Sequence, residues 1–176
     1  LFPIILVAHN PDWSTIFLEE KEAISNILDK ECIVSLEHIG STAIPGIMAK
    51  PTIDILMIIE RDLDVIALSK RLCDIGYIAL QKPKNPPPHL MLVKGYTLIG
   101  FEGQAFHIHL RYRGLWDELC FRDYLKTNSS AAFAYEKLKI QLAHSYPNNR
   151  EAYTEGKTDF VKSIVEKARK EGYGKE

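Results

Sequence analysis

A single acidic residue interrupts an otherwise apolar segment of strand length. The segment Thr52–Ile59 reads Thr-Ile-Asp-Ile-Leu-Met-Ile-Ile, and Asp54 is its only charged residue. Such a β-branched, apolar run predicts a strand that is buried on both faces. A carboxylate in this position needs a metal ion, a cation or strong hydrogen-bond donors, because burying it alone costs several kcal/mol. An ion pair with a neighbouring Lys or Arg is the purely structural alternative.

The hydrophobic periodicity of the rest of the chain predicts an α+β domain: a mixed β-sheet flanked by helices, with a helical C-terminal third. Further strands are expected at Ile4–Ala8, Cys32–Ile39, Tyr77–Leu80, Leu90–Val93, Thr97–Phe101 and Ala105–Tyr112. Helices are expected at Trp13–Leu28, Asp62–Ile75, Leu115–Lys126, Ser130–Ser145 and Arg150–Lys170. Gly95 and Gly103 are expected to be turns between the last three strands, and Asn149 is expected to cap the last helix.

Length and charge narrow the class of protein. The chain has 176 residues and a formal net charge of −1, so we expect one domain over residues 1–176, no attraction to a membrane surface, and no nucleic acid partner. Its three cysteines are widely spaced, which argues against disulfides and a cysteine zinc site and favours the cytoplasm. No segment has the length of a membrane span, and the apolar start at Leu1–Ala8 lacks the basic region of a signal peptide. The oligomeric state does not follow from the sequence.

A glycine-containing turn is predicted between the two strands that precede and contain Asp54. The sequence Glu37-His38-Ile39 leads into Gly40-Ser41-Thr42, which offers backbone N–H groups and two hydroxyls. Such a turn can bind an anion in a concave nest. The alternative is an ordinary turn between two strands, capped by its own hydroxyl groups.

Two histidines and an arginine alternate with apolar residues in the expected strand Ala105–Tyr112. Because neighbouring side chains of a strand point to opposite faces, His107, His109 and Arg111 are predicted to share one face. That face would meet an anion, a metal ion or only solvent. Two imidazoles do not define a metal site, which needs a third or fourth ligand.

The helical third contains Arg122, Lys139 and Lys157. Taken singly, each is expected on a solvated helix face. Arg122 and its neighbour Asp123 are not expected to form a pair, because adjacent helix positions diverge.

Taken together, these segments resemble the GrpB family, which has been placed in the nucleotidyltransferase superfamily. The resemblance covers nearly the whole chain, and its most specific block runs from His38-Ile39-Gly40-Ser41-Thr42 to Asp54. The other matching segments are Asn10-Pro11-Asp12-Trp13, Ile44-Pro45-Gly46, Ala49-Lys50-Pro51, Gly76-Tyr77, His107-Ile108-His109, Phe121-Arg122-Asp123-Tyr124-Leu125, Lys139–Leu142, and Tyr153 with Lys157 and Phe160.

The resemblance implies that a Gly-Ser turn holds the triphosphate of a nucleotide and that carboxylates on the next strand hold Mg²⁺ or Mn²⁺. Active members of that superfamily carry two acids one residue apart on this strand, whereas this chain has only Asp54. Glu37 would then be a second carboxylate, and His107 or His109 would replace a third. The residues expected to bind phosphate are His38, Gly40, Ser41, Thr42, Lys50, Arg111, Arg122, Lys139 and Lys157.

Four functions follow as hypotheses. The first is metal-dependent nucleotidyl transfer, with Asp54, Glu37, His107 and His109 as catalytic and metal-binding residues. The second is a non-catalytic module that binds a nucleotide or another phosphorylated small molecule. The third is a metal-dependent hydrolase that uses Asp54, His107 and His109, with His38 as a further candidate. The last is a binding partner of another protein.

Overall fold

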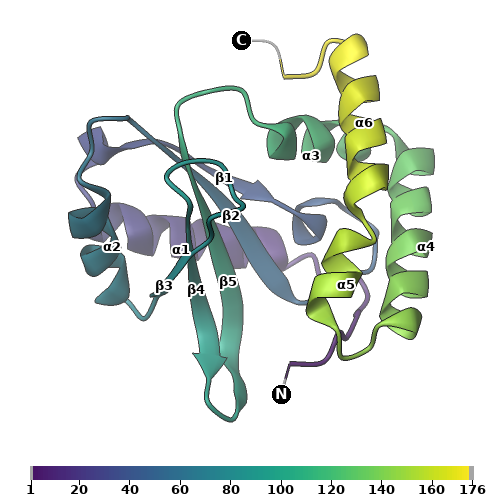
Figure 1. Cartoon of the computed structure of the whole chain (residues 1–176), viewed down its shortest axis with the longest axis horizontal. Coiled ribbons are helices and arrows are strands. Elements are labelled where there is room, and N and C mark those ends of the chain that lie inside the picture. The colour runs from purple at the N-terminus through teal and green to yellow at the C-terminus, as the bar shows by residue number, and fades with distance from the viewer. Residues whose placement is uncertain (1, 175–176) are drawn as a thin grey trace. The chain divides into compact units, whose positions relative to one another are not determined.

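The apolar segment forms strand β2 of a five-stranded mixed sheet in the computed structural model, which describes residues 2–174 (Figure 1). The strands are β1 (Ile33–Ile39), β2 (Thr52–Ile59), β3 (Ile78–Gln81), β4 (Leu90–Thr97) and β5 (Gly100–Tyr112). The α-helices are α1 (Trp13–Ile27), α2 (Val65–Cys73), α3 (Asp117–Thr127), α4 (Ser129–Ser145), α5 (Arg150–Glu155) and α6 (Thr158–Lys170). Two short 3₁₀ helices are η1 (Lys30–Cys32) and η2 (Ser41–Ala43). The predicted α+β class, with a mixed sheet and a helical C-terminal third, is confirmed.

The contacts of the chain divide it into two compact units. The first, here called the sheet unit, contains Pro11–Ile39 and Thr52–Gly114. The second, the helical unit, contains the described residues up to Asn10, the segment Gly40–Pro51, and the described residues from Leu115 onward. The expectation of a single domain over residues 1–176 stays a prediction.

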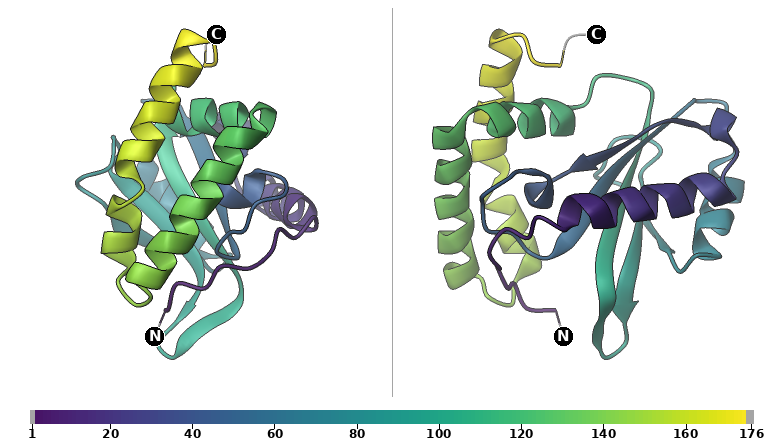
Figure 2. Two further views of the ribbon diagram at one scale, coloured as in Figure 1. Left: turned by 90° about the vertical axis from the view of Figure 1, so that its right-hand side faces the viewer. Right: turned by 180° about the vertical axis from the view of Figure 1, so that it is seen from behind.

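The strands of the sheet unit follow the order β1-β2-β5-β4-β3. β2 is antiparallel to β1 and parallel to β5, and the remaining pairs are antiparallel. α1 covers one face of the sheet (Figure 2): the ring of Phe17 stacks on His38 of β1, and Glu20 pairs with Lys94 of β4. Ile53, Ile55 and Met57 show no exposed surface, because the sheet and its helices enclose them.

The helical unit has its own apolar core. α3 packs against both α4 and α6, as both panels of Figure 2 show. The core residues include Phe121 and Leu125 of α3, Tyr135 of α4 and Val165 of α6. Near the N-terminus, Val7 and Ala49 form an isolated antiparallel bridge, with N–O distances of 2.9 and 3.0 Å. The strand expected at Ile4–Ala8 is therefore wrong: one bridge holds this segment in an otherwise irregular path.

The predicted three-stranded meander is instead one long hairpin of β4 and β5. Gly95 is not a turn but a bulge within β4, where the pairing register shifts between Lys94 and Tyr96. Its φ is +85°, and a Cβ atom there would lie 2.5 Å from the backbone oxygen of Gln104. Gly103 lies inside β5. Sequence patterns do not separate a glycine that bends a strand from one that ends it.

The single helix expected at Arg150–Lys170 is two helices. α5 ends at Glu155, and α6 begins at Thr158 after Gly156 and Lys157. Asn149 caps α5 as predicted, since its side chain accepts a hydrogen bond from the Ala152 amide at 3.0 Å.

Candidate metal centre

Asp54 and the two histidines of β5 lie next to each other on one face of the sheet. In the parallel pairing of β2 with β5, Asp54 is directly opposite His107, and Leu56 is opposite His109. Residues in register share a face, and so do residues two apart on one strand. Phe106, which pairs with Ile53, therefore points to the other face together with the rest of the apolar set, as the alternation predicts.

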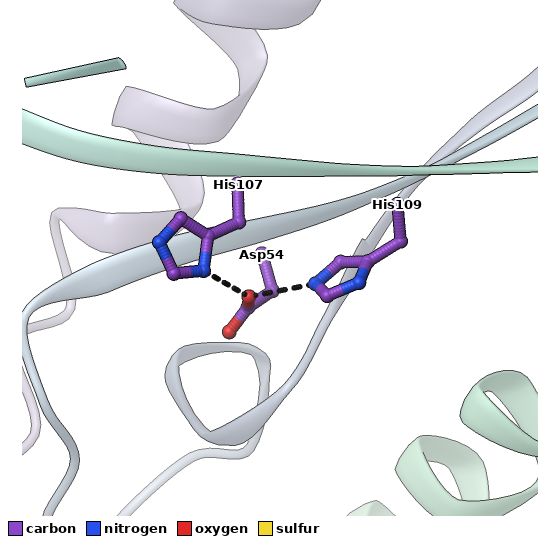
Figure 3. A group of neighbouring side chains, drawn as sticks. All are labelled: Asp54, His107 and His109. Atoms are coloured by element: carbon purple, nitrogen blue, oxygen red, sulfur yellow. Dashed lines mark hydrogen bonds and ion pairs between the residues drawn. The ribbon is translucent and has the colours of Figure 1, made fainter. Parts of the chain in front are cut away.

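The three side chains converge on one carboxylate oxygen (Figure 3). Asp54 Oδ1 lies 3.0 Å from His109 Nε2 and 3.4 Å from His107 Nδ1. One ligand atom from each residue lies within 4.8 Å of the other two. Two ligands that each sit about 2.1 Å from a shared ion are about 3.0–3.4 Å apart in octahedral or tetrahedral geometry, and the two spacings from Asp54 to the histidines have these values.

The electrostatics keep the Asp54 carboxyl group ionised. Burial opposes ionisation of this carboxyl, but hydrogen bonds and charge attraction from His107 and His109 outweigh it and hold the pKa well below its usual range. The side chain is 26% exposed and those of the histidines 16% and 23%, so a small ion can reach them. The sequence left open an ion pair between Asp54 and a Lys or Arg. In the structure, the two imidazoles of His107 and His109 contact the carboxylate instead.

Tyr96 adds a partner that the sequence did not indicate. Its hydroxyl lies 2.6 Å from Nε2 of His107, the ring nitrogen that faces away from Asp54. Histidines that bind metals usually hydrogen-bond through their second nitrogen, which fixes the ring and its tautomer. The bulge at Gly95 brings Tyr96 to this face. In the sequence, Tyr96 stands out only as an aromatic residue beside a glycine. Because Gly95 was expected to be a turn, the sequence did not predict which face of the sheet Tyr96 would occupy.

The other candidate residues of the sheet unit lie elsewhere on the strands. Glu37 pairs with Leu56 and so shares the face of Asp54, but it is not a member of the three-residue cluster. His38 pairs with Ile55 and stacks on Phe17, with ring centroids 4.9 Å apart, on the face that α1 covers. Arg111 is buried on the face of the histidines, and its Nη1 donates to the Leu110 carbonyl at 2.9 Å.

The glycine-containing turn belongs to the helical unit and follows β1 directly. Gly40 has φ +72° and ψ −173°, a backbone conformation that is almost restricted to glycine. Ser41 and Thr42 continue as the 3₁₀ turn η2. The role of Gly40, Ser41 and Thr42 in phosphate binding stays a prediction.

The candidate basic residues of the helical unit do not all lie on solvated helix faces. Lys139 is 1% exposed, which corrects the expectation of a solvated face. The ammonium groups of Lys50 and Lys157 lie 5.3 and 4.6 Å from the ring centroid of Tyr153. Arg122 Nε donates to the carboxylate of its neighbour Asp123 at 2.7 Å, so the expectation that they would not pair is wrong.

Two imidazoles and one carboxylate resemble the three-ligand sets of catalytic metal sites, which leave positions open for water or substrate. The described residues form an α+β protein. Its sheet carries a candidate divalent-cation centre, the cluster of Asp54, His107 and His109. The chain belongs to the GrpB family, whose GrpB protein profile matches residues 3–167. None of the helices in the described part of the chain is long and apolar enough to cross a membrane.

Similar proteins cover most of the chain. The glutamate-rich protein GrpB of Alkalihalophilus pseudofirmus is 34% identical over 92% of this chain and 94% of its own length. A UPF0157 protein of Pseudomonas aeruginosa is 37% identical over 90% of the chain, which spans 65% of that protein. The crystal structure of the conserved protein GrpB from Enterococcus faecalis has a TM-score of 0.80 and 33% identity, over 95% of this chain and 98% of that one.

Proposed function

We propose that the chain is a metal-dependent enzyme that hydrolyses a phosphoanhydride bond of a nucleotide or a similar phosphorylated small molecule. The observation that carries this proposal is the convergence of Asp54, His107 and His109 within 4.8 Å. The expectation of a nucleotide or phosphorylated ligand comes from the family resemblance. The Asp54 carboxylate, already ionised, and the two imidazoles would hold the cation.

The ligand chemistry favours Mn²⁺, Fe²⁺ or Zn²⁺ over the Mg²⁺ expected from the resemblance. Imidazole is a common ligand of these transition metals, whereas Mg²⁺ prefers carboxylates, phosphates and water. When bound at such a site, the ion would lower the pKa of a water ligand and polarise a phosphoryl oxygen. Hydrolysis is preferred because the cluster contains one carboxylate, while two-metal transfer needs a more acidic ligand set.

Nucleotidyl transfer is the second candidate, supported by one observation. β5 lies next to β2, so His107 is directly opposite Asp54, where the resemblance predicts a third acid. With transfer, a nucleoside monophosphate would move to an acceptor and pyrophosphate would leave. With hydrolysis, water would be the acceptor.

The test starts from metal-free protein. Mn²⁺ and Zn²⁺ should each raise the melting temperature of the wild-type chain, and Asp54→Asn and His109→Ala should abolish the shift. His144→Ala, which removes an exposed histidine at the end of α4, is the control and should keep it. Labelled nucleoside triphosphates with each metal then show whether phosphate, pyrophosphate or a labelled acceptor forms. No metal binding would reject the centre, and metal binding without turnover of any triphosphate would reject the enzyme.

A further inference from the structure

The closed end of the β4–β5 hairpin exposes two large aliphatic side chains. Leu98 and Ile99 are 96% and 92% exposed, and they form the two-residue turn between Thr97 and Gly100, which pair with each other. The hairpin extends beyond the other strands of the sheet (Figures 1 and 2). Two-residue turns that meet only water usually contain asparagine, aspartate or glycine. A Leu-Ile turn at a projecting end therefore indicates a surface that another molecule covers.

The turn is also suited to leaving water. Thr97 Oγ1 donates to the Gly100 carbonyl at 2.9 Å and accepts from the Ile99 amide at 3.3 Å, so these two backbone groups keep their partners when the turn is buried. Phe101, 46% exposed, packs against the ring of Tyr96 with the centroids 5.1 Å apart. The segment from Gly95 to Phe101 contains no charged residue. Leu98, Ile99 and Phe101 are here called the hairpin tip.

An apolar groove lies between α1 and β1 of the same unit. Its volume is about 360 Å³, and its apolar lining is Leu28, Ile33, Val34 and Leu36. A cavity of about 150 Å³ holds a molecule as large as benzene, so the groove has room for two aliphatic side chains. The charged residue of the lining is Lys21, whose Nζ donates to the Leu36 carbonyl at 3.1 Å and has further protons to donate.

The hairpin tip of a chain cannot reach the groove of the same chain. Ile33 pairs with Ile59, and Ile59 pairs with Tyr112, which is at the end of β5 opposite to Gly100. A strand of this length advances by about 40 Å. The tip and the groove therefore lie at opposite ends of the sheet unit, and a tip that enters a groove must come from another molecule.

We propose that the chain associates head-to-tail with a second copy of itself, by inserting its hairpin tip into the groove between α1 and β1. Charge complementarity favours this occupant, because the exposed Glu102 follows the tip and Lys21 lines the groove. The formal net charge of −1 opposes association only weakly. Three side chains cover less than the roughly 1,200 Å² of a stable interface, so the contact is reversible. The inference does not depend on the proposed function.

Sedimentation velocity of the full chain tests the proposal. Between about 10 µM and 1 mM, the sedimentation coefficient of the wild-type chain should rise reversibly with concentration. The double variant Leu98→Asp, Ile99→Ser makes the tip polar and should weaken association by about tenfold or more. Ile66→Ser, at an isoleucine of α2 that is 70% exposed, is the control for lost apolar surface and should leave association unchanged.

The groove has a matched pair of variants. Ser25 of α1 lines the groove and Ser69 of α2 does not, yet each hydroxyl donates to the carbonyl four positions earlier at 2.7 Å. Ser25→Glu fills the groove with a carboxylate that repels Glu102, and it should weaken association by about tenfold or more. Ser69→Glu should change it by less than about twofold.

A mixture of two defective proteins separates this contact from other forms of association. The tip variant keeps its groove and Ser25→Glu keeps its tip, so an equimolar mixture should form complexes of one copy of each and nothing larger. Association of Ser25→Glu alone would overturn the proposal and indicate that the tips pair with each other. A wild-type chain that stays monomeric up to about 1 mM would also overturn it. In that case, binding of wild type but not of the tip variant to phosphatidylcholine vesicles would assign the tip to a lipid surface.

Discussion

In the sheet unit, the carboxylate of Asp54 has two imidazoles within 3.4 Å, and the carboxylate of Glu20 accepts hydrogen bonds from both Lys94 and Tyr77. In the helical unit, Lys139 has a carbonyl and an aromatic ring beside it, and it is influenced by the charges of Lys157, Glu136 and Lys50. The two carboxylates are therefore met by basic side chains in direct contact, whereas the buried ammonium group of Lys139 donates to a neutral carbonyl. A buried carboxylate in contact with basic groups keeps its charge, whereas a buried ammonium group that donates to a neutral carbonyl binds its proton more weakly.

The largest expected effect concerns the pH dependence of stability in the helical unit. The pKa of Lys139 falls from its ordinary value of 10.5 to about 7 on folding, so between these values the unfolded chain binds a proton that the folded chain has released. Stability should therefore rise with pH across this window, by up to about 1.4 kcal/mol per pH unit. Below pH 7 both states are protonated and the full penalty of the buried charge remains.

Urea unfolding of wild type and Lys139→Met from pH 6 to 10 measures this slope. Only the difference between the two proteins is diagnostic, because other groups also titrate. The wild-type chain should gain stability relative to the variant as the pH rises. Parallel curves would show that Lys139 stays charged, and the contrast between the units would then be lost.

Breaking a balanced pair in the sheet unit should give the next largest effect. Lys94→Met leaves the carboxylate of Glu20, 8% exposed, with the Tyr77 hydroxyl alone, and should lower the free energy of unfolding by about 3 kcal/mol. Arg71→Met breaks the exposed ion pair with Asp29 and should cost less than about 1 kcal/mol. If the two variants lose the same free energy of unfolding, the ion pair between Lys94 and Glu20 contributes little to stability.

Tyr96→Phe sharpens the assignment of the metal centre. The variant removes the hydroxyl that lies 2.6 Å from His107 Nε2, and metal affinity should fall about tenfold without loss of the fold. Competition with a chromophoric chelator measures the affinity. Tyr146→Phe, at an exposed tyrosine that follows α4, should leave it unchanged. If the metal affinity of Tyr96→Phe is unchanged, the Tyr96 hydroxyl does not position His107 for metal binding.

The smallest effect concerns the helix that precedes Lys157. Asn149→Ala removes the side-chain cap of α5 and should cost about 1 kcal/mol in urea unfolding. Asn148→Ala, next to it and exposed, is the matched control and should be close to neutral. If both variants lose the same free energy of unfolding, the loss comes from changing the loop and not from removing the cap of α5.

The sequence predicts best where one local pattern decides the structure. β2 has the predicted bounds because its apolar run leaves no alternative, and the alternation in β5 correctly groups His107 with His109. The sequence does not predict the long hairpin, because the bulge at Gly95 depends on the close approach of Gln104 from another strand. Tyr96 could not be assigned to the site for the same reason.

Long-range packing also decides the burial of charge. Lys139 lies on a helix whose local sequence is compatible with exposure, and its burial follows from contacts with residues of the segment Gly40–Pro51. The family resemblance singled out Lys50, Lys139 and Lys157, but only the structure brings their charges together. Whether Glu37 acts with Asp54 remains a prediction from the sequence.

The parallel pairing of β2 with β5 also has a consequence for how the chain folds. Asp54 and His109 are 55 positions apart, and the chain between them contains a helix and two strands. Such distant pairings are slow to close, because the intervening loop loses entropy first. A chain in which β5 has not paired with β2 lacks the three-residue cluster, so binding of a divalent cation at the proposed centre would report this pairing during refolding.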